Sequence, residues 1–435
     1  MSKIKVLELF GGIGACSKAL KRLGIDYEIA DYVEIDKYAV ASYNAINGTN
    51  FEPQDICKWD KDIEVDLIMH GSPCQDFSLA GKQAGGDEGS GTRSSLMYET
   101  IRIVEKLKPK YVIWENVKNL LSKKHIHNFN AYLETMEQLG YTNYYQVLNA
   151  KDYGIPQNRE RVFTISIRVE TYGDYFFPIY KPINFQFPPK QELKLKLKDM
   201  LEDEVDEKYY LSEKMIKYIS ATGTANFRNP DCKINLDIAR PLTTDPNKRA
   251  GTTNYLSDDL PNNYDLSILV KNATKKGYLE AYEGDSINLS YPNSETRRGR
   301  VIEQVNQTLQ CNDSMGVVIN TYSDYVNKKY KEFEEKNGYI PELFNPYNKK
   351  EIFDIAPTQT AQGDSITKSS TILKKEDLRI RKLTPKECWR LMGFDDEDYE
   401  KASKFNSNTQ LYKQAGNSIV VNVLEAILRE LLINE

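Results

Sequence analysis

The sequence predicts an α/β protein in which a doubly wound, mostly parallel sheet carries helices on both faces and is joined to a second, smaller domain that is irregular and β-rich. Alternating strand-like and helix-like segments in the first part of the chain predict the sheet domain. A glycine-rich turn after the first apolar run, residues 10–15, is typical of the first strand–helix junction of such sheets. A change in composition near residues 178–189 predicts where the second domain begins.

The elements of the sheet domain follow from hydrophobic periodicity. Apolar runs predict strands at residues 3–9, 27–33, 65–69, 111–114 and 162–167. Helical spacing of apolar residues predicts helices at residues 17–23, 36–46, 95–107 and 128–139. Helical character returns near the end of the chain, at residues 384–392 and 418–432.

The middle of the chain has a different character. A lysine-rich alternating run, residues 194–198, follows the prolines and aromatic residues of 178–189. From there to about residue 380 the sequence is rich in Asn, Thr, Ser, Gly and Tyr. Such polar sequence with short apolar stretches predicts a domain with much loop.

Composition places the chain among globular proteins. Its 435 residues are 40% hydrophobic and 28% charged, with a formal net charge of −5. The six cysteines are scattered without a C-x-x-C spacing and there are only three histidines, so neither a disulfide framework nor a metal site is expected. No apolar run reaches the length of a membrane span, and the N-terminus lacks the apolar core of a signal peptide. We therefore expect a cytoplasmic protein without a membrane partner.

Cys74 is the first candidate for chemistry. It follows Pro73 shortly after the apolar run 65–69, which places a thiol in a tight loop at the carboxyl end of a strand. Open α/β sheets bind and transform their ligands at that edge. The proline stiffens the backbone and directs the cysteine side chain. The alternative is a small buried hydrophobic residue, which would more often lie within an apolar run.

The glycine-rich turn and Glu34 favour a nucleoside cofactor. Small residues let a ligand approach the backbone, and the N-terminus of the following helix favours negative charge. Glu34 ends the second predicted strand, about 20 residues after Gly14, where an acid can hold ribose hydroxyls. No lysine follows in a G-K-[ST] arrangement, so a nucleoside-triphosphate loop is excluded. Tight turns also need glycine for conformational reasons alone.

Two further groups of polar residues lie at strand ends. Glu115 follows Trp114 at the end of another strand, at the same edge as Cys74; an acid that begins a helix is the ordinary alternative. Arg159 and Arg161 are two residues apart and would point the same way on a strand. They suit a phosphate or a pyrimidine oxygen, whereas alternating charge on an exposed strand is the alternative.

Together these residues resemble the DNA (cytosine-5) methyltransferases. Residues 10–14 (FGGIG) resemble the family's first motif, 73–75 (PCQ) its nucleophile motif, 115–117 (ENV) its glutamate motif and 157–161 (QNRER) its Q-x-R-x-R motif. Residues 381–394 resemble the ninth motif and 414–423 the tenth. The motifs occur in family order along almost the whole chain. Glu8 stands where the family commonly has Asp, and Ala15 where a further glycine often stands.

The resemblance implies methyl transfer from S-adenosylmethionine to C5 of a cytosine, with S-adenosylhomocysteine as the product. Cys74 would add as a thiolate to C6 of the ring. Glu115 would act at N3 as a carboxylic acid whose pKa is raised by burial. Arg161 would hold the cytosine O2, and Arg159 would support the site or a phosphate. The cytosine must first be rotated out of the duplex, and residues 83–95 are expected to close over it.

The resemblance also implies a set of binding residues and a division of the chain. The catalytic, Rossmann-like methyltransferase domain would comprise 1–185 plus 380–435, and the target-recognition domain 186–379. The expected cofactor-binding residues are Phe10, Gly11, Gly12, Gly14, Glu34, Asp55, Asn417 and Ser418. The expected nucleic-acid contacts are Gln75, Arg93, Arg297, Arg298 and Arg300.

The expected setting is a bacterial restriction–modification system or a phage. The partner would be double-stranded DNA, bound by a monomer, with a cognate restriction endonuclease acting separately. An RNA (tRNA) cytosine-5 methyltransferase is an alternative, although RNA-acting relatives have a smaller central domain. A catalytically silent DNA-binding module is a second alternative. A cysteine hydrolase is a third and would need His70, His125 or His127 near Cys74.

Overall fold

The computed structural model describes most of the first part of the chain and of its C-terminal segment, and shorter stretches of the middle. The described residues are 3–73, 96–169, 171–172, 179–180, 184–210, 268–274, 277–291, 294, 296–309, 315–320, 332–333, 335–338, 343–345, 350–351, 373–374 and 378–433. Within these residues, no helix is both long and apolar enough to cross a membrane.

The chain divides into two compact units. The first consists of Met1–Glu204, Gln304–Ser314 and Leu383–Glu435, and the second of Val205–Glu303 and Met315–Lys382. This division differs from the predicted boundaries in two places. Residues 186–204 belong to the first unit, and so does the short segment 304–314, which the sequence analysis placed inside the second domain.

A six-stranded sheet forms the centre of the first unit. Its order is β2 (Tyr27–Val33), β1 (Ile4–Leu9), β3 (Leu67–His70), β4 (Tyr111–Val117), β7 (Glu160–Arg168) and β5 (Tyr141–Asn149). The first four strands in this order are parallel, and β7 runs antiparallel to both of its neighbours. The predicted α/β fold is therefore confirmed, with one reversed strand. The sequence analysis missed β5, an edge strand of mixed polarity.

Helices cover both faces of this sheet. Those of the first half are α1 (Ala15–Leu23), α2 (Lys37–Asn47), α3 (Met97–Leu107) and α4 (Ile126–Gln138). Inward-facing residues of α3 and α4 share one core with Leu7, Ile68 and Trp114 of the strands. The alternate strand residues Val6 and Ile113 are also wholly buried, so the opposite face is covered as well.

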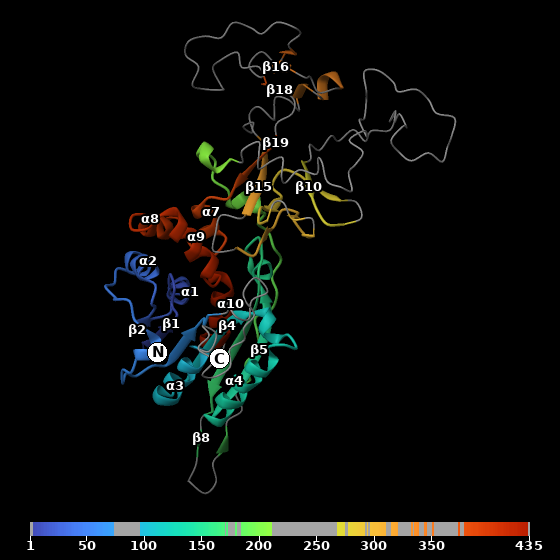
Figure 1. Cartoon of the computed structure of the whole chain (residues 1–435). Helices are drawn as coiled ribbons and strands as arrows, with labels where there is room; N and C mark the ends of the chain where they lie inside the picture. The colour runs from blue at the N-terminus through green and yellow to red at the C-terminus, as the bar shows by residue number, and fades with distance from the viewer. Residues whose placement is uncertain are drawn as a thin grey trace, which may run out of the picture. The chain divides into compact units, whose positions relative to one another are not determined.

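The C-terminal segment completes the first unit. It contains α7 (Pro385–Arg390), α8 (Asp396–Ser403), α9 (Asn408–Asn417) and α10 (Val421–Leu432). Figure 1 shows α10, in red, beside the blue α1, and the two helices pack against each other. Lys18 of α1 forms an ion pair with Asp398 of α8 at 2.6 Å. The last helices of the chain thus pack against its first helix.

The second unit is built from short strands. One sheet has the order β13 (Val301–Ile302), β12 (Ser286–Asn288), β15 (Met315–Asn320) and β19 (Leu378–Lys382). A hairpin of β10 (Ile268–Lys271) and β11 (Tyr278–Ala281) contributes to a small core that includes Ile287 and Val318. The remaining strands of the chain are β6 (Gln157–Asn158), β8 (Thr171–Tyr172), β9 (Ile179–Tyr180), β14 (Asn306–Gln307), β16 (Leu343–Asn345), β17 (Lys350–Glu351) and β18 (Leu373–Lys374).

Candidate active site

The glycine-rich turn between β1 and α1 has a backbone that few side chains would allow. Gly12 and Gly14 have positive φ angles of 54° and 84°, and Phe10 also adopts a left-handed φ of 53°. A Cβ on Gly11 would lie 2.6 Å from the ring of Tyr32. A Cβ on Gly12 would have no atom within 4 Å, so this side of the turn is open to a ligand.

Glu34 lies directly beside this turn. Its Oε2 accepts a hydrogen bond from the Gly12 backbone N–H at 3.2 Å, and its Oε1 accepts one from Asp36 N–H at 2.8 Å. Burial raises the pKa of the Glu34 carboxyl. The next residue, Ile35, is 70% exposed, and this apolar surface beside the acid was not expected from the sequence. The only sequence signal for it is an apolar residue placed outside the strand.

Glu8 forms a buried support beneath the turn. Its carboxyl accepts hydrogen bonds from the Ser17 N–H and hydroxyl groups in α1 and from the Tyr43 hydroxyl of α2 at 3.4 Å. It thereby ties β1 to the helix that follows the turn. Burial raises the pKa of Glu8 to about 7, although these hydrogen bonds act in the opposite direction.

The other expected cofactor residues lie on two further segments of the first unit. Asp55 accepts a hydrogen bond from Cys57 N–H at 3.1 Å and so caps a short 3₁₀ helix. Asn417 is exposed, whereas Ser418 is buried at the end of α9. Gln414 of α9 accepts a hydrogen bond from the Ser42 hydroxyl of α2 at 3.0 Å, which holds this C-terminal segment against α2.

Glu115 and Arg161 form the ion pair at the centre of the candidate site. Arg161 Nε lies 3.0 Å from Oε1 of Glu115, and both side chains are largely buried. A Cβ on Gly71 would lie 3.7 Å from Oε2 of Glu115 and 3.6 Å from Cδ1 of Ile419. The loop that leads from β3 to Cys74 therefore begins beside the Glu115 carboxyl.

The base of that loop is held by polar contacts from β4. Ser72 Oγ accepts a hydrogen bond from the Trp114 indole N–H at 3.0 Å, and the Ser72 carbonyl accepts one from the Asn116 amide at 3.4 Å. His70 is stacked on Trp114 with ring centroids 5.7 Å apart. Burial lowers the pKa of His70 to about 3, so its ring is neutral. This residue is wholly buried and has the packing role expected from its strand position, which argues against its use as a hydrolase base.

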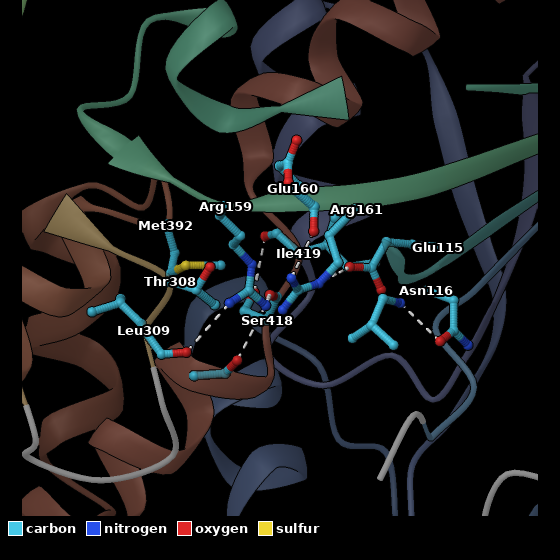
Figure 2. A network of polar contacts seen from close by, with 12 residues as sticks. Glu115, Asn116, Arg159, Glu160, Arg161, Thr308, Leu309, Met392, Ser418 and Ile419 are labelled. Carbon is cyan, nitrogen blue, oxygen red and sulfur yellow. Dashed lines mark hydrogen bonds and ion pairs between the residues drawn. The ribbon is translucent and has the colours of Figure 1, made fainter. Parts of the chain in front are cut away.

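Arg159 and Arg161 have different partners, although they are only two residues apart (Figure 2). The chain leaves strand geometry between β6 and β7, at Arg159. The buried Arg159 guanidinium donates to the carbonyls of Gly416 at 3.1 Å, Ser418 at 2.8 Å and Leu309 at 3.5 Å. Of the two predicted roles for Arg159, this geometry fits support of the site and not a phosphate contact.

Gln157 strengthens the same junction. Its amide donates to the Leu391 carbonyl at 2.7 Å and its Oε1 accepts from Leu309 N–H at 3.4 Å. The strand β6 also pairs in parallel with β14. Gln157 and Arg159 therefore attach residues 306–309 to the C-terminal part of the first unit. The sequence analysis did not expect this use of the Q-x-R-x-R motif.

Three expected site residues, Cys74, Gln75 and Arg93, lie outside the described residues, as does the expected closing loop 83–95. Their placement remains a prediction.

The family profile described as C-5 cytosine-specific DNA methylase matches residues 4–432. The chain belongs to this family. The predicted family and the predicted enzyme class, a DNA cytosine-5 methyltransferase, are thereby confirmed, and the reading as a silent DNA-binding module is not needed.

The chain is similar to several curated members of the family. The orphan methyltransferase M.SPRI of Bacillus phage SPR is 33% identical, covering 99% of this chain and 98% of the relative. The type II methyltransferase M2.ScrFI of Lactococcus lactis subsp. cremoris is 32% identical, covering 85% and 67%.

Solved structures share the fold at lower sequence identity. A Spodoptera frugiperda DNMT2 mutant has a TM-score of 0.53 at 19% identity, covering 99% of each chain. The Entamoeba histolytica methyltransferase EhMeth has a TM-score of 0.52 at 14% identity, covering 100% of this chain and 99% of the other. These likenesses support the α/β methyltransferase fold alone.

The three arginines expected to contact nucleic acid do not form one surface. Arg298 is exposed and Arg297 half-buried, but Arg300 is 0% exposed. The Arg300 guanidinium donates to the carbonyls of Asn288, Ser290 and Tyr291 within the second unit. The expectation of a direct DNA contact by Arg300 is corrected accordingly, because its donors are used inside the protein.

Proposed function

We propose that this DNA cytosine-5 methyltransferase transfers a methyl group from S-adenosylmethionine to C5 of a cytosine rotated out of a specific short duplex sequence, through a transient bond between Cys74 and C6. The single observation that carries the proposal is the proximity of Gly71 to Glu115. Gly71 begins the loop that leads to Cys74, and Glu115 is the carboxyl group that the family resemblance assigns to N3 of the cytosine. The start of this loop therefore lies beside that carboxyl group.

The chain's own residues would drive the reaction by changing the electron density of the ring. The Cys74 thiolate adds to C6, which makes C5 nucleophilic. Glu115 holds N3 while charge develops there, and Arg161 orients the Glu115 carboxyl and stabilises O2. After C5 has received the methyl group, a base removes its proton and the thiolate leaves. Arg159 acts as a positioning residue that holds the backbone of Gly416 and Ser418.

The edge formed by the glycine-rich turn fits S-adenosylmethionine, which supplies the methyl group on a sulfonium centre. The open space at Gly12 would accept the ligand close to the backbone. Glu34, already oriented by two backbone N–H groups, would hold the ribose hydroxyls. Phe10 and the exposed Ile35 would offer apolar surface to the adenine ring, and Asp55, Asn417 and Ser418 would complete the site.

The second unit would recognise the target sequence, and the protein would act on double-stranded DNA as a monomer. Extrusion of the cytosine costs a few kcal/mol, which contacts with the duplex must supply. The phage SPR relative is named an orphan methyltransferase, whereas the Lactococcus relative is named a type II enzyme. The reaction proposed here is complete without a partner endonuclease.

Covalent trapping tests the proposal. A duplex whose cytosines are replaced by 5-fluorocytosine blocks proton removal from C5, so that with S-adenosylmethionine the wild-type protein should form a stable adduct with DNA. Cys74→Ser should abolish the adduct. Cys57→Ser is the matched control, because Cys57 is an exposed free cysteine in the short 3₁₀ helix Ile56–Lys58. An adduct that persists in Cys74→Ser would refute the proposal.

The role of Glu115 is tested by a second pair of variants. Glu115→Gln should lower the methylation rate by about 10²-fold or more, the contribution usual for a positioned acid. Glu160→Gln is the control, since Glu160 lies on the neighbouring strand β7 and pairs with Lys118 at the surface. Parallel incubation with tRNA separates the RNA alternative, because methylation of tRNA alone would reject DNA as the substrate.

A further inference from the structure

The turn at Tyr291 in the second unit presents an aromatic side chain from a strained backbone. Tyr291 has a left-handed φ of 50° and is 75% exposed. This conformation costs about 1–2 kcal/mol for a residue with a Cβ, and an exposed ring returns little of that through packing. The fold therefore gains little from this side chain, and most of the ring is accessible for a contact outside the fold.

A buried arginine holds this turn. Arg300 donates to the carbonyls of Asn288 at 3.2 Å, Ser290 at 3.2 Å and Tyr291 at 2.8 Å. The Tyr291 carbonyl also accepts from Ser294 N–H at 2.9 Å. Because one planar guanidinium reaches three carbonyls of the same turn, Arg300 fixes the path of the backbone on which Tyr291 stands.

Two more arginines accompany the exposed ring. The Arg297 guanidinium carbon lies 5.8 Å from the centre of the Tyr291 ring, within the range of a cation–π contact. Arg298 Nε donates to the Ala273 carbonyl at 3.0 Å, and Arg297 accepts from Ala273 N–H through its own carbonyl. The backbone that carries both cations is thus braced against the segment that follows β10.

We propose that Tyr291 and Arg297 form a contact with duplex DNA, Tyr291 through its ring and Arg297 through a phosphate, and that Arg300 is the positioning residue that presents them. The inference rests on the proposed role of the second unit in target recognition and names the residues that perform it. Exposed aromatic rings next to arginine are the combination that stacks on or wedges between bases while a cation holds the backbone. Burial, and to a lesser extent the positive charge of Arg297, lower the pKa of Arg300. The second effect reflects how close the Arg297 and Arg300 guanidinium groups lie to each other.

Quantitative DNA binding tests the contact. The probe is a duplex that carries the sequence methylated by the wild-type protein in cells, as found by bisulfite sequencing. Tyr291→Ala should raise the Kd about tenfold, because stacking of one ring contributes about 1–3 kcal/mol. Tyr291→Phe should stay within about twofold, since the ring is retained. Tyr282→Ala, a change at an exposed tyrosine with ordinary backbone in the same unit, should leave the Kd unchanged.

Arg297 and Arg300 have different proposed roles. The salt dependence of DNA binding tests Arg297, and a double variant with Tyr291→Ala tests Arg300. Arg297→Ala should reduce the steepness of log Kd against log salt concentration by about 1, as expected for one lost phosphate contact. Arg300→Met should raise the KM for DNA with kcat at saturating DNA unchanged. The double variant Tyr291→Ala/Arg300→Met should bind DNA more weakly than Tyr291→Ala, but by less than the sum of the two single effects, because Arg300 acts in part through Tyr291.

An unchanged Kd in Tyr291→Ala would overturn the inference while leaving the proposed function in place, provided that the wild type methylates DNA. Strictly additive effects in the double variant would overturn the positioning role of Arg300. If Arg300→Met does not fold, the contrast between Tyr291→Ala and Tyr291→Phe decides alone. A wild-type protein that methylates no duplex would refute the proposed function instead. A Tyr291→Ala variant that loses a protein partner but not DNA affinity would also overturn the DNA contact.

Discussion

Two turns of this protein hold an aromatic residue in left-handed backbone, and they are supported in opposite ways. Phe10 follows β1 in the first unit with φ 53°, and Tyr291 follows β12 in the second with φ 50°. Phe10 is packed against the main core, whereas Tyr291 is largely exposed. A buried acid, Glu8, ties together the elements that flank the first turn, while a buried base, Arg300, holds the second through its carbonyls.

Under the proposed function, the difference follows from what each turn must offer a ligand. The first turn offers open space beside Gly12, so glycines and a packed aromatic ring are sufficient. The second presents a side chain, so its backbone must be held while its ring stays free of the core. Beneath the first turn, Ser17 and Tyr43 donate hydrogen bonds to the Glu8 carboxyl. Beneath the second turn, the Arg300 guanidinium donates hydrogen bonds to backbone carbonyls.

The largest expected effect concerns the acid beneath the first turn. Its pKa of about 7 lies above the ordinary value of 4.5, so between these pH values only the folded protein keeps the Glu8 proton. The free energy of unfolding should therefore fall as pH rises through this range, by about 3 kcal/mol in total. Glu8→Gln should remove this decrease. Chemical denaturation of both proteins at about pH 5 and about pH 8 measures the difference.

The groups that face Glu8 do not reverse this expectation. Tyr43 and Tyr27 both have pKa values raised above the ordinary value of 10.0, and burial also raises the pKa of Cys16, so these groups stay neutral over the same range. Parallel pH curves for the wild type and Glu8→Gln would show that Glu8 is ionised throughout. Arg300→Met should show the same decrease with pH as the wild type, because Glu8 is still present and the arginine that is removed keeps its charge over this range.

The next effect tests the close packing of the first turn. Gly11→Ala should lower the free energy of unfolding by about 2 kcal/mol and weaken S-adenosylmethionine binding, because the new Cβ would lie 2.6 Å from a Tyr32 ring stacked on Tyr43. Gly24→Ala is the control: its φ of 66° makes alanine strained, but nothing lies within 4 Å. Thermal unfolding and calorimetric titration with the cofactor report both quantities. Equal loss of cofactor affinity in the two variants would contradict the expectation.

Glycine substitutions at the two aromatic residues should give effects of opposite character. Phe10→Gly relieves the left-handed strain but loses packing against the core, so we expect a net destabilisation of about 1–2 kcal/mol. Tyr291→Gly relieves the same strain and loses little packing, so its stability should stay within about 0.5 kcal/mol of the wild type while DNA affinity falls. Denaturant unfolding of each variant measures this, and a destabilised Tyr291→Gly would show that the ring is packed.

The smallest effect is expected at Arg298. Its side chain is exposed and is held by a single hydrogen bond to Ala273. Arg298→Ala should weaken duplex binding by about threefold or less, corresponding to under about 1 kcal/mol. Fluorescence anisotropy at fixed salt compares it with Arg297→Ala. A larger loss for Arg298 than for Arg297 would move the proposed contact to the other arginine.

Much of the first unit could be predicted because its signals are local. Apolar runs and glycine spacing predicted β1, β2 and α1 to within two residues at each end, and the helical spacing of residues 384–392 predicted α7. The edge strand β5 and the acidic helix α8 were missed, because neither carries a regular apolar pattern. Their assignment depends on what packs against them.

The amino-acid order by itself determined the family, the α/β class and the identity of the candidate chemical groups, because those depend on residue type and spacing along the chain. Only the tertiary structure decided how neighbouring arginines are used. Arg161 meets a carboxylate, Arg159 meets carbonyls of the C-terminal segment, and Arg300 is buried beneath a turn. The physical reason is that a guanidinium binds any correctly placed oxygen, and which oxygens lie within reach is a property of contacts between residues far apart in the chain.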